Sequence, residues 1–215
     1  LMPPDMYRRS LIHLTAGTVV NLTDLSQKLV ELGYERADIV ESTGQFAVRG
    51  GIVDIYPPNY DFAIRVEFFG DEVDSIRRFD PASQRSVEHM EEAVVTPSRE
   101  IIYTLDMKPG ITERIQKSLK EYEKKTEGSK LSERINADID RIRFEHYFPG
   151  IDRYLPFIAE TAVSVVDYLD DETVVFIDEN RRVRKRMEEV CLEHMETCKM
   201  LMEKEQILPE SCDIY

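Results

Sequence analysis

Two acidic residues follow an apolar run in the C-terminal half, and this pattern can support nucleotide chemistry. Residues 173–177 read Thr-Val-Val-Phe-Ile and are followed by Asp178 and Glu179. In a Walker B strand, an acid at the end of a buried strand holds Mg²⁺ and a following glutamate can orient water. The sequence contains no GxxxxGK[ST] phosphate loop, however. We therefore expect residues 173–177 to form a buried parallel strand without a working nucleotide site.

A second group of residues could recognise a protein partner. On a strand predicted over residues 62–69, alternation places Ile64, Val66 and Phe68 on one face. The opposite face then carries Arg65, Glu67 and Phe69, and Arg49 ends the neighbouring predicted strand. Arginines beside an exposed aromatic ring are typical of interface hot spots. Phe69 is therefore either part of a partner site or an apolar residue covered by a loop.

The sequence gives little indication of a catalytic site, a metal site or a disulfide framework. The four histidines share no spacing, no serine or cysteine lies in a recognisable nucleophile elbow, and the three cysteines contain no CxxC pattern. We accordingly expect no catalytic residue, no metal site and reduced thiols.

Periodicity divides the chain near Pro97. Before it, leucines at helical spacing after Asn21 predict one helix that ends at Gly33. Short apolar runs separated by glycine and proline predict an antiparallel meander with strands over residues 37–41, 45–49, 52–56, 62–69, 73–79 and 87–95.

After Pro97, helical spacing dominates. Helices are predicted from Gly110 to Tyr122, from Leu131 to Tyr147 and over residues 179–205, with a polar break at residues 126–129. The expected fold class is α+β or α/β: a small antiparallel β-rich domain with one helix over residues 10–97, then an α/β domain with a helical hairpin over residues 98–215.

Composition excludes several classes of function. The formal net charge is −14, and residues 11–97 hold seven basic against 15 acidic side chains, which opposes binding to DNA phosphates or anionic lipid. The chain has no 18-residue apolar run and no signal peptide, so we expect a soluble cytoplasmic protein without membrane contacts. It does not begin with methionine, and we expect a piece of a longer protein.

Three segments carry a resemblance to a known family: residues 29–58, 64–86 and 147–160. They include RGGIVDIYPP, FDPASQRS and YFPGIDRYLPFIAE. With them, the chain resembles the UvrB-homology region of bacterial transcription-repair coupling factors (Mfd) and, more distantly, the excinuclease component UvrB. The similarity extends from about Pro3 to Glu179.

The resemblance implies two domains. Residues 10–97 would be the UvrA-binding domain 2, whose contact surface falls on Arg49, Arg65, Glu67 and Phe69. Residues 98–215 would be the second part of a split, degenerate RecA-like domain 1. The UvrB pattern Asp-Glu-Ser-His reads Asp178-Glu179-Asn180-Arg181 here, which supports a degenerate Walker B-like site.

The resemblance also implies which partners belong to this region. ATP and Mg²⁺ would serve a motor elsewhere in the full-length family protein, so that no cofactor is expected in this fragment. UvrA would bind here, while RNA polymerase, DNA and an autoinhibitory C-terminal domain would be partners of the full-length protein.

Three hypotheses follow. The first is a noncatalytic adaptor of transcription-coupled nucleotide excision repair that recruits UvrA to stalled RNA polymerase. The rival is a fragment of a nucleotide-dependent DNA translocase or helicase that uses Asp178 and Glu179 with a phosphate loop from outside this chain. A DNA-binding repair domain is a third reading, which the charge of −14 opposes.

Overall fold

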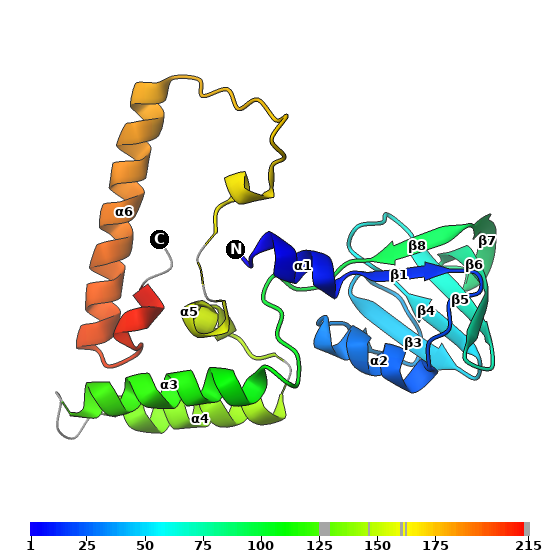
Figure 1. Ribbon diagram of the computed structural model, residues 1–215, viewed down its shortest axis with the longest axis horizontal. Coiled ribbons are helices and arrows are strands. Elements are labelled where there is room, and N and C mark those ends of the chain that lie inside the picture. Colours follow the sequence, from blue (N-terminus) through cyan, green and yellow to red (C-terminus); the bar gives the residue numbers. More distant parts are fainter. Residues whose placement is uncertain (125–129, 146, 160, 162, 213–215) are drawn as a thin grey trace. The chain divides into compact units, whose positions relative to one another are not determined.

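The structure, a computed structural model, describes residues 1–124, 130–145, 147–159, 161 and 163–212. It divides into a β-rich unit, Asp5–Leu105, and a helical unit, Asp106–Tyr215 with Leu1–Pro4 (Figure 1). The predicted mixed class is confirmed, because antiparallel sheet and helices both contribute. The domain bounds 10–97 and 98–215, and the RecA-like assignment of the second domain, stay predictions.

The strands of the β-rich unit form two sheets. The larger has the order β2-β3-β4-β5-β6-β7, with β2 and β3 parallel and the other neighbours antiparallel, and the smaller pairs β1 with β8. The elements are α1 (Pro4–Ser10), β1 (Ile12–Thr15), α2 (Leu22–Glu31), β2 (Glu35–Arg36), β3 (Gln45–Arg49), β4 (Ile52–Ile55), β5 (Ala63–Phe69), β6 (Glu72–Asp80), β7 (Arg85–Met90) and β8 (Glu92–Val95).

Helix α2 forms where the sequence predicts it. The Asn21 side chain accepts a hydrogen bond from the Thr23 amide at 2.8 Å and caps the first turn. Gly33, with φ of +87°, ends the helix in the left-handed conformation that glycine adopts at no steric cost. Leu25 and Leu29 are buried and belong to the main core of the unit.

The two faces of the larger sheet differ in chemistry. One face supplies the main core with apolar side chains that include Phe46, Val53, Ile64, Val66 and Ile76. The other carries a smaller cluster of buried residues, Val40, Ala47, Ala63 and Phe79. Charged side chains of differing exposure, which include Asp54, Arg65 and Glu67, occupy much of the rest of that second face.

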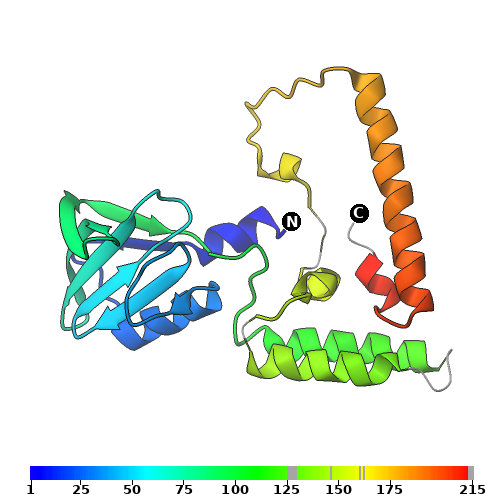
Figure 2. The same ribbon diagram turned by 180° about the vertical axis from the view of Figure 1, so that it is seen from behind.

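The helical unit contains an antiparallel hairpin of α3 (Lys108–Glu123) and α4 (Leu131–Phe144), which lie side by side in both views (Figure 2). The predicted break at residues 126–129 lies outside the described residues. Further elements are η1 (Ile151–Tyr154), α5 (Leu155–Ile158), η2 (Val165–Tyr168), α6 (Asn180–Glu203) and η3 (Pro209–Cys212). Within the described part of the chain, no helix combines the length and apolar character needed to cross a membrane.

A buried polar contact ties α4 to the segment after it. The Tyr154 hydroxyl donates to Asp138 at 2.8 Å, and burial, followed by that hydrogen bond, raises the pKa of Tyr154. At the other helix, the Lys108 ammonium donates to the carbonyls of Arg143 and Glu145, which are among the unpaired groups at the end of α4.

Three strand predictions are wrong. Residues 37–41 form no strand, because Val40 folds onto the sheet and the amides of Glu41 and Ser42 donate to the Gln45 side chain. The run predicted over 87–95 divides into β7 and β8, which belong to different sheets.

The third error concerns residues 173–177, which form no regular secondary structure. Val174, Val175, Phe176 and Ile177 are 72%, 55%, 90% and 63% exposed, so that this run is neither a strand nor buried. A strand requires a neighbour to complete its backbone hydrogen bonds. All strands among the described residues lie in the β-rich unit, so that no such neighbour accompanies residues 173–177.

Candidate interaction surface

The strand register gathers charged side chains on one face of the larger sheet. Asp54 of β4 pairs with Arg65 of β5, which pairs with Arg77 of β6. Two residues along, Glu67 of β5 pairs with Ser75 of β6, and Arg49 ends β3 at the same level. We call the following set the charged face: Arg49, Asp54, Arg65, Glu67, Phe69, Ser75 and Arg77.

A buried carboxylate lies between the two arginines that the sequence singled out. The Asp54 side chain is 1% exposed and accepts from Arg65 through Nε at 2.7 Å and Nη2 at 2.9 Å. Arg49 Nη2 donates to the same carboxylate at 2.5 Å. Such charge-assisted contacts are stronger than neutral hydrogen bonds, and both arginines are held by one anion.

Arg65 is the more enclosed of the two arginines. Its side chain is 13% exposed, compared with 45% for Arg49, and its guanidinium lies 4.2 Å from the centre of the buried Phe79 ring. The hydrogen bond to Asp54 raises the pKa of Arg65 and so favours its charged form.

Glu67 is also held by neighbours on β6. Its carboxylate accepts from the Ser75 hydroxyl at 2.8 Å and lies 3.6 Å from Arg77 Nη2. The Glu67 side chain remains 30% exposed, so that it can contact a partner while its orientation is set by β6.

Phe69 projects from the turn between β5 and β6. It is 85% exposed, whereas the preceding Phe68 packs against the main core. Gly70, with φ of +65°, follows directly and allows the two-residue turn. The structure therefore places an unprotected aromatic ring on the face that also carries Arg65 and Glu67.

Sequence reasoning located this face but missed part of it. Alternation on β5 placed Arg65, Glu67 and Phe69 together, and the structure brings Arg49 to the same carboxylate as Arg65. Asp54 was missed, although a carboxylate between the apolar residues Val53 and Ile55 was a signal of a charge partner across the sheet. The role of these residues in binding a partner stays a prediction.

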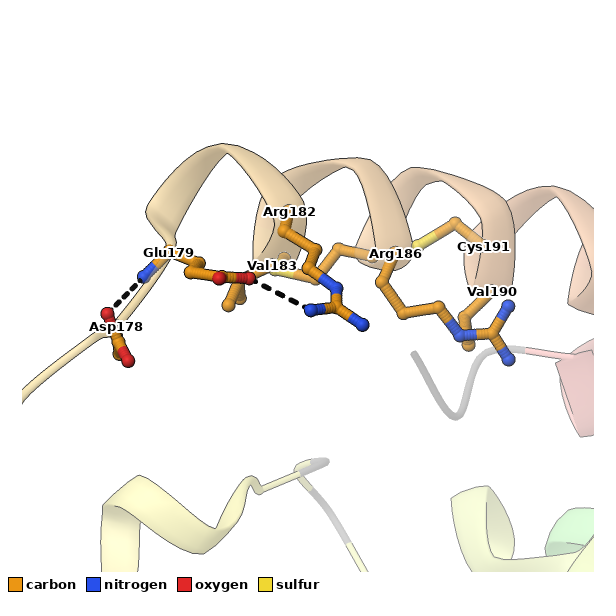
Figure 3. A pocket seen from close by; sticks show the side chains of 8 residues that line it. Asp178, Glu179, Arg182, Val183, Arg186, Val190 and Cys191 are labelled. Atoms are coloured by element: carbon orange, nitrogen blue, oxygen red, sulfur yellow. Dashed lines mark hydrogen bonds and ion pairs between the residues drawn. The ribbon is translucent and has the colours of Figure 1, made fainter.

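Asp178 and Glu179 do not lie at the end of a strand, as the acids of a Walker B motif do. Both are exposed, Asp178 accepts from the Glu179 amide at 2.8 Å, and the Glu179 carboxylate pairs with Arg182 at 3.0 Å (Figure 3). A groove of about 760 Å³ at this end of α6 is lined by Asp178, Glu179, Arg182, Val183, Arg186, Met187, Val190 and Cys191. The residues before Asp178 form no strand, so that the two acids are not displayed at a strand end.

The sequence of the chain is similar to those of known DNA-repair proteins. Residues 12–101 match the UvrB interaction domain family, and this range contains the whole charged face. The chain is 33% identical over 212 residues to a transcription-repair-coupling factor of Bacillus subtilis, with 97% of this chain aligned to 18% of that protein.

UvrB proteins have a similar level of sequence identity to this chain. The chain is 33% identical over 189 residues to UvrABC system protein B of Thermotoga petrophila, which covers 82% of this chain and 28% of that protein. It is 34% identical over 179 residues to the same protein of Thermosipho africanus, with 78% and 27% covered. The chain thus spans less than a third of the length of these relatives. Residues 12–101 of the β-rich unit thus match the UvrB interaction domain family, and the chain as a whole is similar to one region of the transcription-repair-coupling factor and UvrABC system protein B relatives.

Proposed function

We propose that the β-rich unit binds UvrA through its charged face, with Arg49, Arg65, Glu67 and Phe69 as the contact residues. The observation that carries this proposal is the 85% exposed ring of Phe69 on the sheet face where Arg49 and Arg65 are hydrogen-bonded to a buried carboxylate. Aromatic and arginine side chains dominate the binding energy of protein interfaces. A sheet face that is already ordered loses little conformational entropy when a partner docks.

In this proposal the chain is a noncatalytic adaptor of transcription-coupled repair, in the cytoplasm, and it recruits UvrA to a stalled RNA polymerase. The similarity to a transcription-repair-coupling factor over 97% of the chain supports this more specific role. The helical unit would be the scaffold, and the adaptor would act without ATP or Mg²⁺. The rival motor hypothesis gains no support from Asp178 and Glu179, because the described segment before them is not a strand.

Calorimetry with purified UvrA tests the proposal. We expect the chain to bind and Arg49→Ala to weaken binding by at least about 2 kcal/mol, the value that defines a hot spot. Arg143→Ala is a matched control, because Arg143 is 43% exposed against 45% for Arg49 and also pairs with a single aspartate. Circular dichroism verifies that each variant is folded. Absence of binding, or equal affinities of the two variants, would contradict the proposed surface.

A further inference from the structure

We infer that Asp54 is a positioning residue of the charged face: it holds Arg65 in place and presents Arg49 to a carboxylate of the partner. The inference rests on the proposed function, because it assigns a role within the same surface. Asp54 itself is 1% exposed and cannot make a substantial contact with UvrA. Its influence on binding must therefore act through the two arginines.

The two arginines have unequal contacts with Asp54. Arg65 donates from both Nε and Nη2, is 13% exposed and stacks over Phe79. Arg49 donates from Nη2 alone and is 45% exposed, so that Nε and Nη1 take no part in the contact with Asp54. Asp54 therefore holds Arg65 through two donor atoms and Arg49 through one, so that Arg49 retains more donors for a partner.

The charges of this triad define the partner group. Two cations around one anion leave a net positive charge, and the more exposed cation is Arg49. Arg49 Nη2 carries two hydrogens, so that donating one of them to Asp54 still leaves one edge of the guanidinium, Nη2 with Nη1 or Nη2 with Nε, complete. Such an edge can bind a carboxylate through paired hydrogen bonds. The chemistry thus selects an aspartate or glutamate of UvrA as the group that meets Arg49.

Positioning and overall charge predict opposite effects of Asp54→Asn. Removal of the negative charge makes the charged face more positive, and long-range electrostatics alone would strengthen binding to an acidic group. An asparagine amide, however, offers one acceptor oxygen in place of two and adds a donor that faces the guanidinium groups. If Asp54 positions the arginines, binding must weaken although the surface becomes more attractive to anions.

A double-mutant cycle measures this role. We expect Asp54→Asn to lower the affinity for UvrA at least about tenfold in the wild-type background. In an Arg49→Ala background, the same change should cost less than about threefold, because the residue that Asp54 presents is absent. A Phe69→Ala background is the control, since Phe69 lies outside the triad of Asp54 and the two arginines, and there the tenfold loss should persist. The inference would be overturned if Asp54→Asn left the affinity for UvrA unchanged or increased it in the wild-type background. It would also be overturned if Asp54→Asn caused equal losses of affinity in the Arg49→Ala and Phe69→Ala backgrounds.

NMR of the free chain tests the positioning without a partner. We expect the Arg65 Nε–H group to be as ordered as the backbone of β5 and to lose this order in Asp54→Asn. A mobile Arg65 Nε–H in the wild-type chain overturns the inference even if the variant does not fold. If Arg65 is ordered but the wild-type chain does not bind UvrA, the proposed function fails, while the positioning of the arginines by Asp54 stands.

Discussion

Replacement of Phe69 by alanine should weaken binding to UvrA and leave the free energy of unfolding nearly unchanged. A buried aromatic side chain removes about 150–250 Å² from solvent. Because Phe69 is 85% exposed in the chain, nearly all of this area is available to a partner. Truncation to alanine forfeits on the order of 100 Å² of apolar burial, or ~2.5 kcal/mol at about 25 cal/mol per Å². This free energy corresponds to a loss of affinity of about 70-fold.

The assay is a comparison of Phe69→Ala with Phe144→Ala by calorimetry against UvrA, with urea unfolding in parallel. Phe144 is 82% exposed at the end of α4, so that the two variants remove the same chemical group from equally exposed positions. Both should change the free energy of unfolding by no more than about 0.5 kcal/mol, as expected for exposed side chains. Equal affinities of the two variants, or a stability loss confined to Phe69→Ala, would refute the reasoning that the ring is a contact residue without a structural role.

Three further predictions concern stability and the acidic pair before α6. Gly51→Ala should lower the free energy of unfolding by about 1–3 kcal/mol in urea, because a Cβ there would lie 2.9 Å from the Phe68 carbonyl oxygen. Burial raises the pKa of Tyr34, whose hydroxyl donates to the Thr96 carbonyl at 2.6 Å. The unfolded chain then loses this proton first, so that stability should fall as the pH rises above about 10, and Tyr34→Phe should show a smaller decline. Asp178→Ala should change neither the affinity for UvrA nor the free energy of unfolding by more than about 0.5 kcal/mol, because the side chain is exposed and the residues directly before it form no strand.

Local signals were sufficient for much of the β-rich unit. Strand β3 lies over the predicted residues 45–49, and β5 lies one residue inside the predicted 62–69, because glycine turns and alternation act over a few residues. The pairing of strands that are distant in the sequence was harder to predict. The apolar run 173–177 has the composition of a buried strand, but burial depends on a neighbouring strand that composition cannot reveal.

The same distinction applies to the charged face. Alternation on one strand predicted that Arg65, Glu67 and Phe69 share a side, since that inference needs only the period of two. The contact between Asp54 and Arg65 depends on the register between β4 and β5, which local patterns in the sequence do not determine. For this reason the sequence assigned Arg49 and Arg65 to one predicted contact surface without distinguishing them, whereas the structure gives them unequal exposure and unequal contacts.

The turns at the ends of two hairpins bring the two most exposed of the proposed contact residues, Arg49 and Phe69, to the same end of the sheet. Arg49 ends β3 directly before Gly50, and Phe69 ends β5 directly before Gly70, and both glycines have positive φ. The Phe68 amide donates to the Gly51 carbonyl at 2.7 Å and so ties one turn to the other. The guanidinium and the ring are thereby presented from adjoining turns of one ordered sheet. Within a segment that holds seven basic and 15 acidic side chains, recognition of a partner must depend on this local arrangement rather than on the overall charge.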